Sequence, residues 1–386
     1  MWLDELAAGS GELRESGRLR ELRTVTSLPH GRAVLDGREY LNLSGNDYLG
    51  LAGDPGLRRE FALRYPDRES PELGMSSSSS RLLTGSTPAA ARLEARLGEL
   101  YGGRAALVFN SGYHANLGIL PALTGSDDLI FSDKLNHASI IDGMRLADAE
   151  FRRYPHLDLD RLEAMLAAKR ASCRRAFIVS ESIFSMDGDS ADLARLVEIK
   201  HKYDAVLVVD EAHAVGVRGP RGLGLAAEVG VDAEIDVLIG TFGKALGSTG
   251  AYAVMAPEVR EHLINHMRPL IFSTALPPVI LNWSRYMLEV SVAADARRAH
   301  LEKLASRLRE RVVAAGFRSG GDSQIVPLLV GSDTGAVELA RKLRERGVLV
   351  FPIRPPTVPV GTSRLRFSLT AALDREDIEL AAGCLS

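Results

Sequence analysis

Ala205-Val206-Leu207-Val208-Val209-Asp210-Glu211-Ala212-His213 is the stretch that decides the fold of this 386-residue chain. Its first five residues are apolar on both alternations, so the strand that they predict is buried on both faces. Similar runs, separated by helical patterns, lie at 106–109, 128–131, 176–180, 237–240 and 251–255. Strands that alternate with helices are typical of an α/β domain. We therefore predict a mostly parallel central sheet that helices cover on both faces.

The residues on either side of this region predict smaller structural units. Residues 1–45 are expected to form an N-terminal arm, with an amphipathic helix that includes Leu13, Leu19 and Leu22 and a hairpin around 35–38. Residues 46–280 would hold the large α/β domain.

The C-terminal residues, 281–386, predict a small α+β domain. A helical stretch at 288–315 comes first. Strand candidates follow near 325–330, 348–352 and 365–370.

The composition limits the possible partners and the cellular compartment. The charges sum to 47 − 50 = −3, which gives no reason to expect a nucleic-acid partner. Only Cys173 and Cys384 are present, which excludes a disulfide scaffold and favours a reducing compartment. The acidic start lacks the pattern of a secretory signal, and the uncharged stretch 105–126 is interrupted by polar residues. We expect a cytoplasmic protein with no membrane partner and no metal site.

Ligands of an open parallel sheet bind beyond the carboxyl ends of its strands, so the residues there are the candidates for chemistry. Ser111-Gly112-Tyr113 predicts a turn from strand to helix whose amides could bind phosphate, although many such turns bind nothing. Asp210 and His213 place an acid and an imidazole at another strand end.

Lys244 follows a strand and lies among small residues, Gly243 and Ala245. Burial there would make it a competent amine for a Schiff base; the alternative is a loop lysine that extends into solvent. His137 also follows a strand, and by itself it could be a structural histidine.

These groups together point to pyridoxal phosphate (PLP). PLP needs an amine, an acid for its ring nitrogen, a phosphate cradle and a group that stacks on its ring. The letters Asp-Glu-Ala-His also occur in ATPases, but that alternative requires a phosphate loop with Gly-Lys-Ser/Thr, which this sequence lacks. A protein that only binds a ligand is a weaker alternative, because such a lysine would have no role in it.

Seven segments of the chain resemble the α-oxoamine synthase family of fold-type I PLP enzymes, in family order. They begin at Asn46, Ser111, Asn136, Ser185, Asp210, Thr241 and Phe272 and read NDYLG, SGY, NHAS, SMDGD, DEAH, TFGK and FST. The resemblance implies a fold-type I transferase, with a mostly parallel sheet in a large domain and a smaller α+β C-terminal domain. It also implies that the protein is an acyltransferase that uses PLP.

The resemblance assigns roles by position. Lys244 is similar to the Schiff-base lysine, Asp210 to the acid at the ring nitrogen and His137 to the histidine on the ring face. The other positions implied to contact the cofactor are Gly112, Tyr113 and Thr241 at the phosphate, Ser185 and His213 at the phenolic oxygen, and Ser273 and Thr274 at the phosphate of a second subunit. A homodimer is therefore implied.

The C-terminal segment from Ile353 to Thr362, which reads IRPPTVPVGT, is most similar to the family member of biotin synthesis. That member joins L-alanine to a pimeloyl thioester, either pimeloyl-CoA or pimeloyl-acyl carrier protein, with loss of CO2. The resemblance implies substrate contacts at Arg20, Asn46, His137, Arg354 and Thr357. A sibling such as glycine C-acetyltransferase is the alternative within the family.

The chain departs from the family at Ser76-Ser77-Ser78-Ser79-Ser80, where many relatives have a glycine-rich turn. A flexible serine linker is one interpretation, but Arg81-Leu82-Leu83-Thr84-Gly85 continues the family pattern. Serine allows fewer backbone angles than glycine, so the shape of this loop is open.

Overall fold

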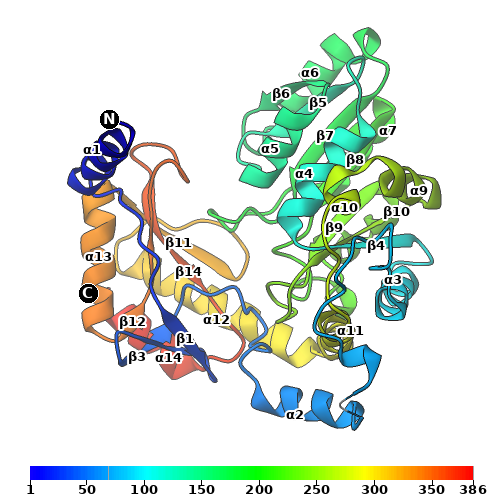
Figure 1. Ribbon diagram of the computed structural model, residues 1–386. Coiled ribbons are helices and arrows are strands. Elements are labelled where there is room, and N and C mark those ends of the chain that lie inside the picture. Colours follow the sequence, from blue (N-terminus) through cyan, green and yellow to red (C-terminus); the bar gives the residue numbers. More distant parts are fainter. Residues whose placement is uncertain (68, 386) are drawn as a thin grey trace. The chain divides into compact units, whose positions relative to one another are not determined.

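The structure is a computed structural model, and it describes residues 1–67 and 69–385 (Figure 1). The contacts divide the chain into two compact units. The larger unit comprises 54–185 and 190–298, and the smaller unit comprises 1–53, 186–189 and 299–386. The boundaries expected from the sequence, at 45/46 and 280/281, differ from this division because the N-terminal residues group with the C-terminal ones.

The larger unit is built on a seven-stranded sheet with the order β4-β10-β9-β8-β7-β5-β6. Neighbouring strands from β9 to β6 are parallel, and β10 is antiparallel to both of its neighbours. The strands are β4 (Ala105–Phe109), β5 (Leu129–Asp133), β6 (Glu150–Tyr154), β7 (Ala176–Glu181), β8 (Ala205–Asp210), β9 (Val237–Thr241) and β10 (Ala251–Met255). The mostly parallel sheet that the sequence predicts is thus confirmed.

One strand of this sheet, β6, was not predicted from the sequence. This strand lies at the edge of the sheet, and Glu150, Arg152 and Arg153 interrupt its apolar residues. Only one side of an edge strand is paired, and charged side chains protect it from association with other chains. Its sequence therefore lacks the apolar run by which the other strands were found.

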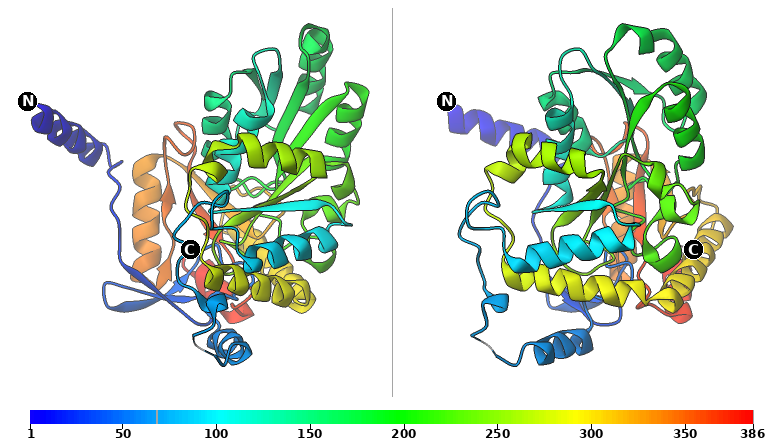
Figure 2. Two further views of the ribbon diagram at one scale, coloured as in Figure 1. Left: turned by 45° about the vertical axis from the view of Figure 1, so that its right-hand side comes forward. Right: turned by 90° about the vertical axis from the view of Figure 1, so that its right-hand side faces the viewer.

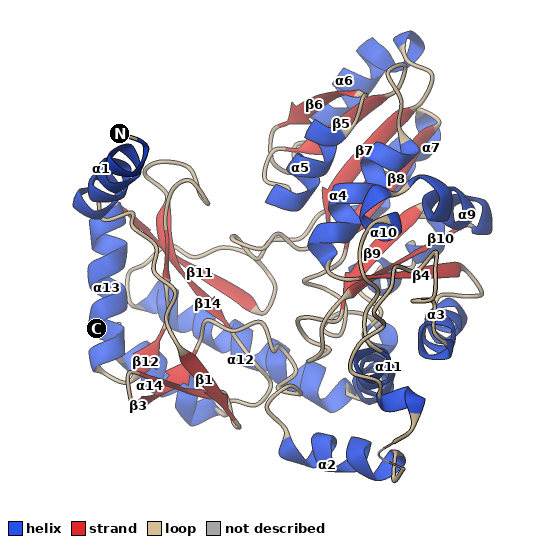
Figure 3. Cartoon of the chain, viewed as in Figure 1, coloured by secondary structure: helices blue, strands red, loops and turns tan. Residues whose placement is uncertain are grey.

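Helices cover both faces of this sheet, as Figures 2 and 3 show. Each face of the sheet packs in its own apolar cluster. The residues of β8 alternate between the two clusters, since Leu207 and Val209 lie in one and Val208 lies in the other. The helices of the larger unit are α2 (Pro55–Arg64), α3 (Pro88–Leu100), α4 (Gly112–Leu123), α5 (Ala138–Leu146), α6 (Leu159–Lys169), α7 (Leu193–Lys202), α8 (Leu225–Glu228), α9 (Pro257–His266), α10 (Arg268–Ile271) and α11 (Pro278–Val292). Helices α4, α5, α9 and α10 contribute to the cluster of Val208, and α3, α6, α7 and α11 to the other.

Helices α4 and α5 pack closely because Gly143 lets their backbones approach. A Cβ atom at Gly143 would lie 2.3 Å from the carbonyl oxygen of Asn116. We expect Gly143→Ala to lower the free energy of unfolding by about 1–3 kcal/mol, since the helices must move apart. The measurement is thermal or urea denaturation.

The matched control for this change is Gly9→Ala, in a helix where nothing lies within 4 Å of the added Cβ. This control should leave the stability unchanged or raise it by up to about 1 kcal/mol, because alanine favours helix. Equal effects of the two substitutions would contradict the packing argument.

The smaller unit contains two sheets with the orders β1-β2-β3-β12 and β11-β14-β13. Their strands are β1 (Val25–Leu28), β2 (Arg32–Leu35), β3 (Arg38–Asn42), β11 (Ile325–Gly331), β12 (Val348–Leu349), β13 (Pro352–Ile353) and β14 (Ser363–Ser368). Its helices are α1 (Trp2–Glu15), α13 (Asp333–Glu345) and α14 (Arg375–Gly383), and α12 (Asp295–Ala314) runs from the larger unit into it. The hairpin predicted around 35–38 is confirmed as β2 and β3.

Three expectations about local structure were wrong. The N-terminal helix ends at Glu15 and excludes Leu19 and Leu22, because Gly17 adopts a left-handed conformation (φ +66°). The helical stretch 288–315 breaks between α11 and α12. The strand candidate at 348–352 is split between two sheets, since β12 pairs with β3 and β13 with β14.

Among residues 1–67 and 69–385, no helix has both the length and the apolar character that a membrane crossing requires.

Candidate functional site

The carboxyl ends of the parallel strands bring together the residues that the sequence marked. Glu181 ends β7 and Asp210 ends β8, and the two are partners in the strand register. Both side chains are buried, with exposed fractions of 3% and 7%. Asp210 is a predicted site residue, whereas no role was predicted for Glu181.

Lys244 lies in the turn that follows β9. Its Nζ atom is 2.8 Å from Nε2 of His213, so these two predicted residues are in direct contact. Thr241 braces the same turn, because its hydroxyl donates a hydrogen bond to the carbonyl of Gly250 (3.0 Å) and accepts one from the amide of Gly243 (3.2 Å). Lys244 is half-buried and His213 is buried.

Asp210 is held in place by two donors. Asn116 Nδ2 donates to Oδ2 (2.7 Å) and the amide of Ala212 donates to Oδ1 (2.8 Å). Asn116 comes from α4 and is 4% exposed. The sequence analysis missed it; a polar residue on the apolar side of that helix was the available signal.

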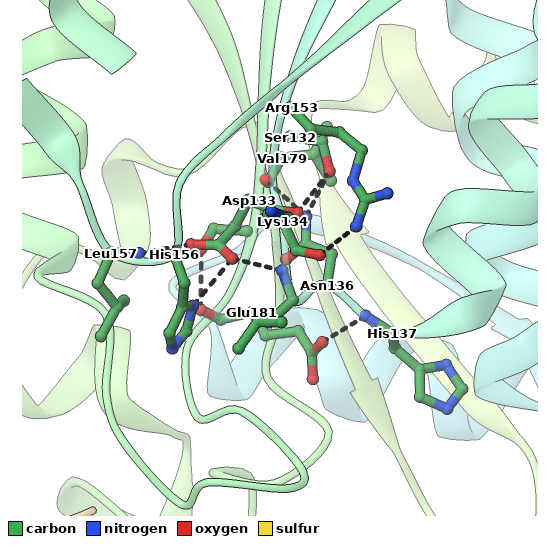
Figure 4. A network of polar contacts seen from close by, with 12 residues as sticks. Ser132, Asp133, Lys134, Asn136, His137, Arg153, His156, Leu157, Val179 and Glu181 are labelled. Carbon is green, nitrogen blue, oxygen red and sulfur yellow. Dashed lines mark hydrogen bonds and ion pairs between the residues drawn. The ribbon is translucent and has the colours of Figure 1, made fainter. Parts of the chain in front are cut away.

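His137 lies at the N-cap position of α5, on a loop that several buried groups fix. Its amide donates to Oε1 of Glu181 (2.6 Å), as Figure 4 shows, and its Nδ1 is 2.7 Å from Oγ of Ser139. Burial raises the pKa of Glu181 well above its usual range, and the charge of Asp210 adds to this effect.

The loop before His137 is anchored by Asp133 (Figure 4). The carboxylate of Asp133 accepts hydrogen bonds from the amides of Leu135 (2.7 Å) and Leu157 (2.8 Å) and lies 2.9 Å from Nδ1 of His156. The side-chain NH2 group of Asn136 donates hydrogen bonds to Ser132 Oγ (2.9 Å) and to the carbonyl of Val179 (2.8 Å). These contacts make His137 a fixed part of the site.

The predicted phosphate cradle lies at the start of α4. Ser111 is the N-cap residue and accepts a hydrogen bond from the amide of His114 (3.2 Å). Gly112 and Tyr113 form the first turn, whose backbone amides have no acceptor within the helix. The Tyr113 hydroxyl donates to Asp142 (2.5 Å), which raises the pKa of Tyr113.

Ser273 and Thr274 lie beside two other segments of the same chain. Asn110 donates to the carbonyl of Thr274 (2.8 Å), and Thr274 forms an isolated bridge with Ser80. Their contact with a second subunit stays a prediction. Ser185 is half-buried and directly precedes the segment 186–189 of the smaller unit.

The serine run is an ordered turn and not a linker. Ser77 donates to the carbonyl of Leu276 (2.7 Å), and Ser79 accepts a backbone hydrogen bond from Ala275 (2.9 Å). Ser78 adopts a left-handed conformation (φ +47°), which glycine would adopt at lower cost.

The four predicted substrate residues of the smaller unit form two groups. In the first, Arg20 donates to Thr357 Oγ1 (3.0 Å), and Arg354 donates to the carbonyl of Gly17.

In the second group, the carboxamide oxygen of Asn46 accepts hydrogen bonds from Arg366 (3.3 Å) and Tyr48 (3.1 Å). Arg366, in β14, is 9% exposed, and the sequence analysis missed it; an arginine within an apolar strand was the signal.

In an ATPase the glutamate of the Asp-Glu-Ala-His segment would matter for magnesium binding. Here that residue, Glu211, has a structural role. Glu211 is fully buried and accepts hydrogen bonds from the amides of Leu225 (2.7 Å) and Ala226 (2.8 Å) at the start of α8. Burial raises the pKa of Glu211 to about 7. This carboxylate is therefore part of the scaffold, which argues against the magnesium site of an ATPase.

Known proteins match the chain along nearly its whole length. Residues 38–385 match the family model described as aminotransferase class I and II. The 8-amino-7-oxononanoate synthase of Chlorobaculum parvum is 53% identical over 379 residues, which cover 96% of this chain and 97% of that protein.

Solved structures agree with this match. A high-resolution structure of SPT, described as holding a PLP internal aldimine, has a TM-score of 0.89 and 30% identity, covering 99% of this chain and 96% of that one. The 8-amino-7-oxononanoate synthase of Francisella tularensis has a TM-score of 0.76 and 29% identity, covering 90% and 96%.

Proposed function

This chain belongs to the class I and II aminotransferase family, and from that premise we propose that it condenses L-alanine with a pimeloyl thioester. The products are 8-amino-7-oxononanoate, CO2 and the free thiol, as in biotin synthesis. The similarity to 8-amino-7-oxononanoate synthases supports this choice. The enzyme is a PLP-dependent acyltransferase of the α-oxoamine synthase type.

The observation that carries the proposal is the set of groups at one edge of the sheet. Lys244 supplies an amine 2.8 Å from His213, and Asp210 supplies a buried carboxylate whose two oxygens are held by neighbouring donors. The amides at the start of α4 suit a phosphate. The residues therefore fit PLP, with Lys244 at its aldehyde, Asp210 at its ring nitrogen, His137 on its ring face and Gly112 and Tyr113 at its phosphate.

Each residue then has a defined chemical task. When bound, PLP supplies an electron sink that makes the α-proton of the amino acid acidic. Lys244 Nζ would hold the cofactor through its aldehyde and would be the base that takes that α-proton. Asp210 keeps a proton on the ring nitrogen. His137 holds the ring face and donates a hydrogen bond to the thioester oxygen, where negative charge develops.

Several of the residues implied to bind the substrate would suit its carboxylates. The guanidinium groups of Arg20 and Arg354 suit the distal carboxylate of the pimeloyl chain, and Thr357, bonded to Arg20, orients the first of them. Asn46 and Arg366 suit the carboxylate of L-alanine. Ser273 and Thr274 would complete the phosphate site of a second subunit in a homodimer.

The absorption spectrum of the purified protein tests this function. We expect a visible band from the bound cofactor, and a shift of that band with L-alanine that is larger than with glycine or L-serine. Release of free thiol from pimeloyl-CoA or pimeloyl-acyl carrier protein should require L-alanine. A stronger response to glycine with acetyl-CoA would assign the chain to the sibling activity, and absence of the band after addition of PLP would refute the cofactor site.

A further inference from the structure

Two side chains, those of Asn116 and Ser139, connect the acid at the ring nitrogen to the histidine on the ring face. Asp210 Oδ2 accepts from Asn116 Nδ2 (2.7 Å), which also lies 3.0 Å from Ser139 Oγ. Ser139 Oγ lies 2.7 Å from His137 Nδ1. Asn116 and Ser139 are 4% and 0% exposed and Asp210 is 7% exposed, so water has little access to the contacts between these three residues. This series of hydrogen bonds joins the end of β8 to helices α4 and α5.

The directions of the first two hydrogen bonds follow from the carboxylate of Asp210. An ionised carboxylate only accepts hydrogen bonds, so the amide of Asn116 must present its NH2 group to Asp210. The second hydrogen of the same NH2 group is donated to Ser139 Oγ. The hydroxyl hydrogen of Ser139 is then available for His137 Nδ1, the nitrogen that lies 2.7 Å away.

The backbone of α5 imposes the same direction on His137. Its Nδ1 also accepts a hydrogen bond from the amide of Ser139 (3.2 Å), which makes the imidazole the N-cap of the helix. A nitrogen that carries a proton could not accept this bond. The N-terminal end of a helix also disfavours a positive charge. Desolvation lowers the pKa of His137, with Lys244 acting in the same direction, against the opposing effect of Asp210.

We propose that Asn116 is a positioning residue that fixes His137 as a neutral imidazole with its proton on Nε2. Nε2 is then a hydrogen-bond donor on the side of the ring that the loop leaves open. In Figure 4 the ring of His137 points away from Glu181. The carboxylate of Glu181 accepts a hydrogen bond from the backbone amide of His137 and does not contact the ring there. Asp210 thus fixes the donor state of His137 as well as the proton of the cofactor ring. The tautomer of His137 is argued from the contacts alone, and its use in catalysis rests on the proposed function.

Nitrogen-15 NMR of the histidine rings tests the proposal directly on the protein with its cofactor bound. His137 is assigned by comparison with His137→Gln, among nine histidines. At pH 7.5 we expect an Nε2 signal typical of a protonated nitrogen and an Nδ1 signal typical of an unprotonated one. An Nδ1–H tautomer, or an imidazolium, would refute the proposal, and an unchanged cofactor band in the same sample would leave the proposed function standing.

Replacement of Asn116 tests whether this residue sets the tautomer. In Asn116→Leu the hydroxyl of Ser139 loses the hydrogen bond that directs its hydrogen toward His137 Nδ1, so it can rotate and accept from that nitrogen instead. We expect the ratio of the Nε2–H to the Nδ1–H tautomer to fall about fivefold, as for the loss of one net hydrogen bond. The two nitrogen signals of His137 should then move toward each other, and kcat should fall more than KM rises.

Two further variants complete the test. Asn116→Ala should give the same shift without added bulk beside Asp210, which covers a failure of the leucine variant to fold. Asn265→Leu is the matched control, since Asn265 is exposed and donates to the carbonyl of Glu261 within α9, and it should leave both signals unchanged. A tautomer ratio that stays at the original value in Asn116→Ala would refute the role of Asn116.

Discussion

Lys244→Ala is expected to lower turnover by about 10⁴-fold or more, equivalent to ~5.5 kcal/mol of transition-state stabilisation. The substitution removes both the amine that binds the cofactor and the base that takes the α-proton. Lys244 is the amine in contact with His213, at 2.8 Å. Steady-state release of thiol from the pimeloyl thioester, with L-alanine saturating, measures the loss.

Two controls separate this chemistry from a general effect on the fold. Lys303→Ala removes an exposed lysine of α12 and should leave turnover unchanged. Borohydride reduction followed by peptide mass mapping should place the cofactor on the peptide that contains Lys244 in the original protein. Turnover within tenfold of the original rate in Lys244→Ala would rule out the assigned role.

Asp210→Asn is expected to lower turnover by about 10²- to 10³-fold, equivalent to ~3–4 kcal/mol. Asparagine has nearly the same shape and can still accept from the amide of Ala212, which lies 2.8 Å from the carboxylate. It lacks the negative charge that keeps a proton on the ring nitrogen of the cofactor. It also lacks the second acceptor oxygen that fixes Asn116. The cofactor should bind, but the α-proton of L-alanine should exchange with D2O far more slowly.

Asp204→Asn provides the matched control. Asp204 is 98% exposed, and its left-handed conformation (φ +47°) is one that asparagine tolerates. This control should change neither exchange nor turnover. If the α-proton of L-alanine exchanged with D2O at the original rate in Asp210→Asn, Asp210 would not have the role assigned to it.

The sequence predicted the larger unit well because its signal is local. Strands buried on both faces must be apolar throughout, and β8 is the clearest case, since its residues enter both apolar clusters. The edge strand β6 has no such constraint, and it was missed. The N-terminal helix was extended too far because its apolar spacing continues past Gly17, where the backbone turns.

The candidate site was predicted where chemistry requires one residue type at a strand end. Lys244, Asp210, His213 and His137 are of this kind. Asn116 and Arg366 were missed because a buried polar residue inside a helix or strand gives no local signal of what it contacts. Glu181 lies at the end of β7 but was given no role, because its contact with the amide of His137 arises only from the packing. Asn116 lies 94 residues from its partner Asp210, and only the packing of α4 against the sheet brings them together.

The sequence alone therefore determined the α/β fold of the larger unit, the family resemblance and the groups that can react with PLP. Those features depend on periodicity and on residue types, which each segment carries in its own sequence. The tertiary structure alone decided which side chains lie between Asp210 and His137, and the grouping of Asn46 with Arg366. Hydrogen bonds between segments far apart in sequence depend on packing to within a fraction of an ångström. No single segment contains that information.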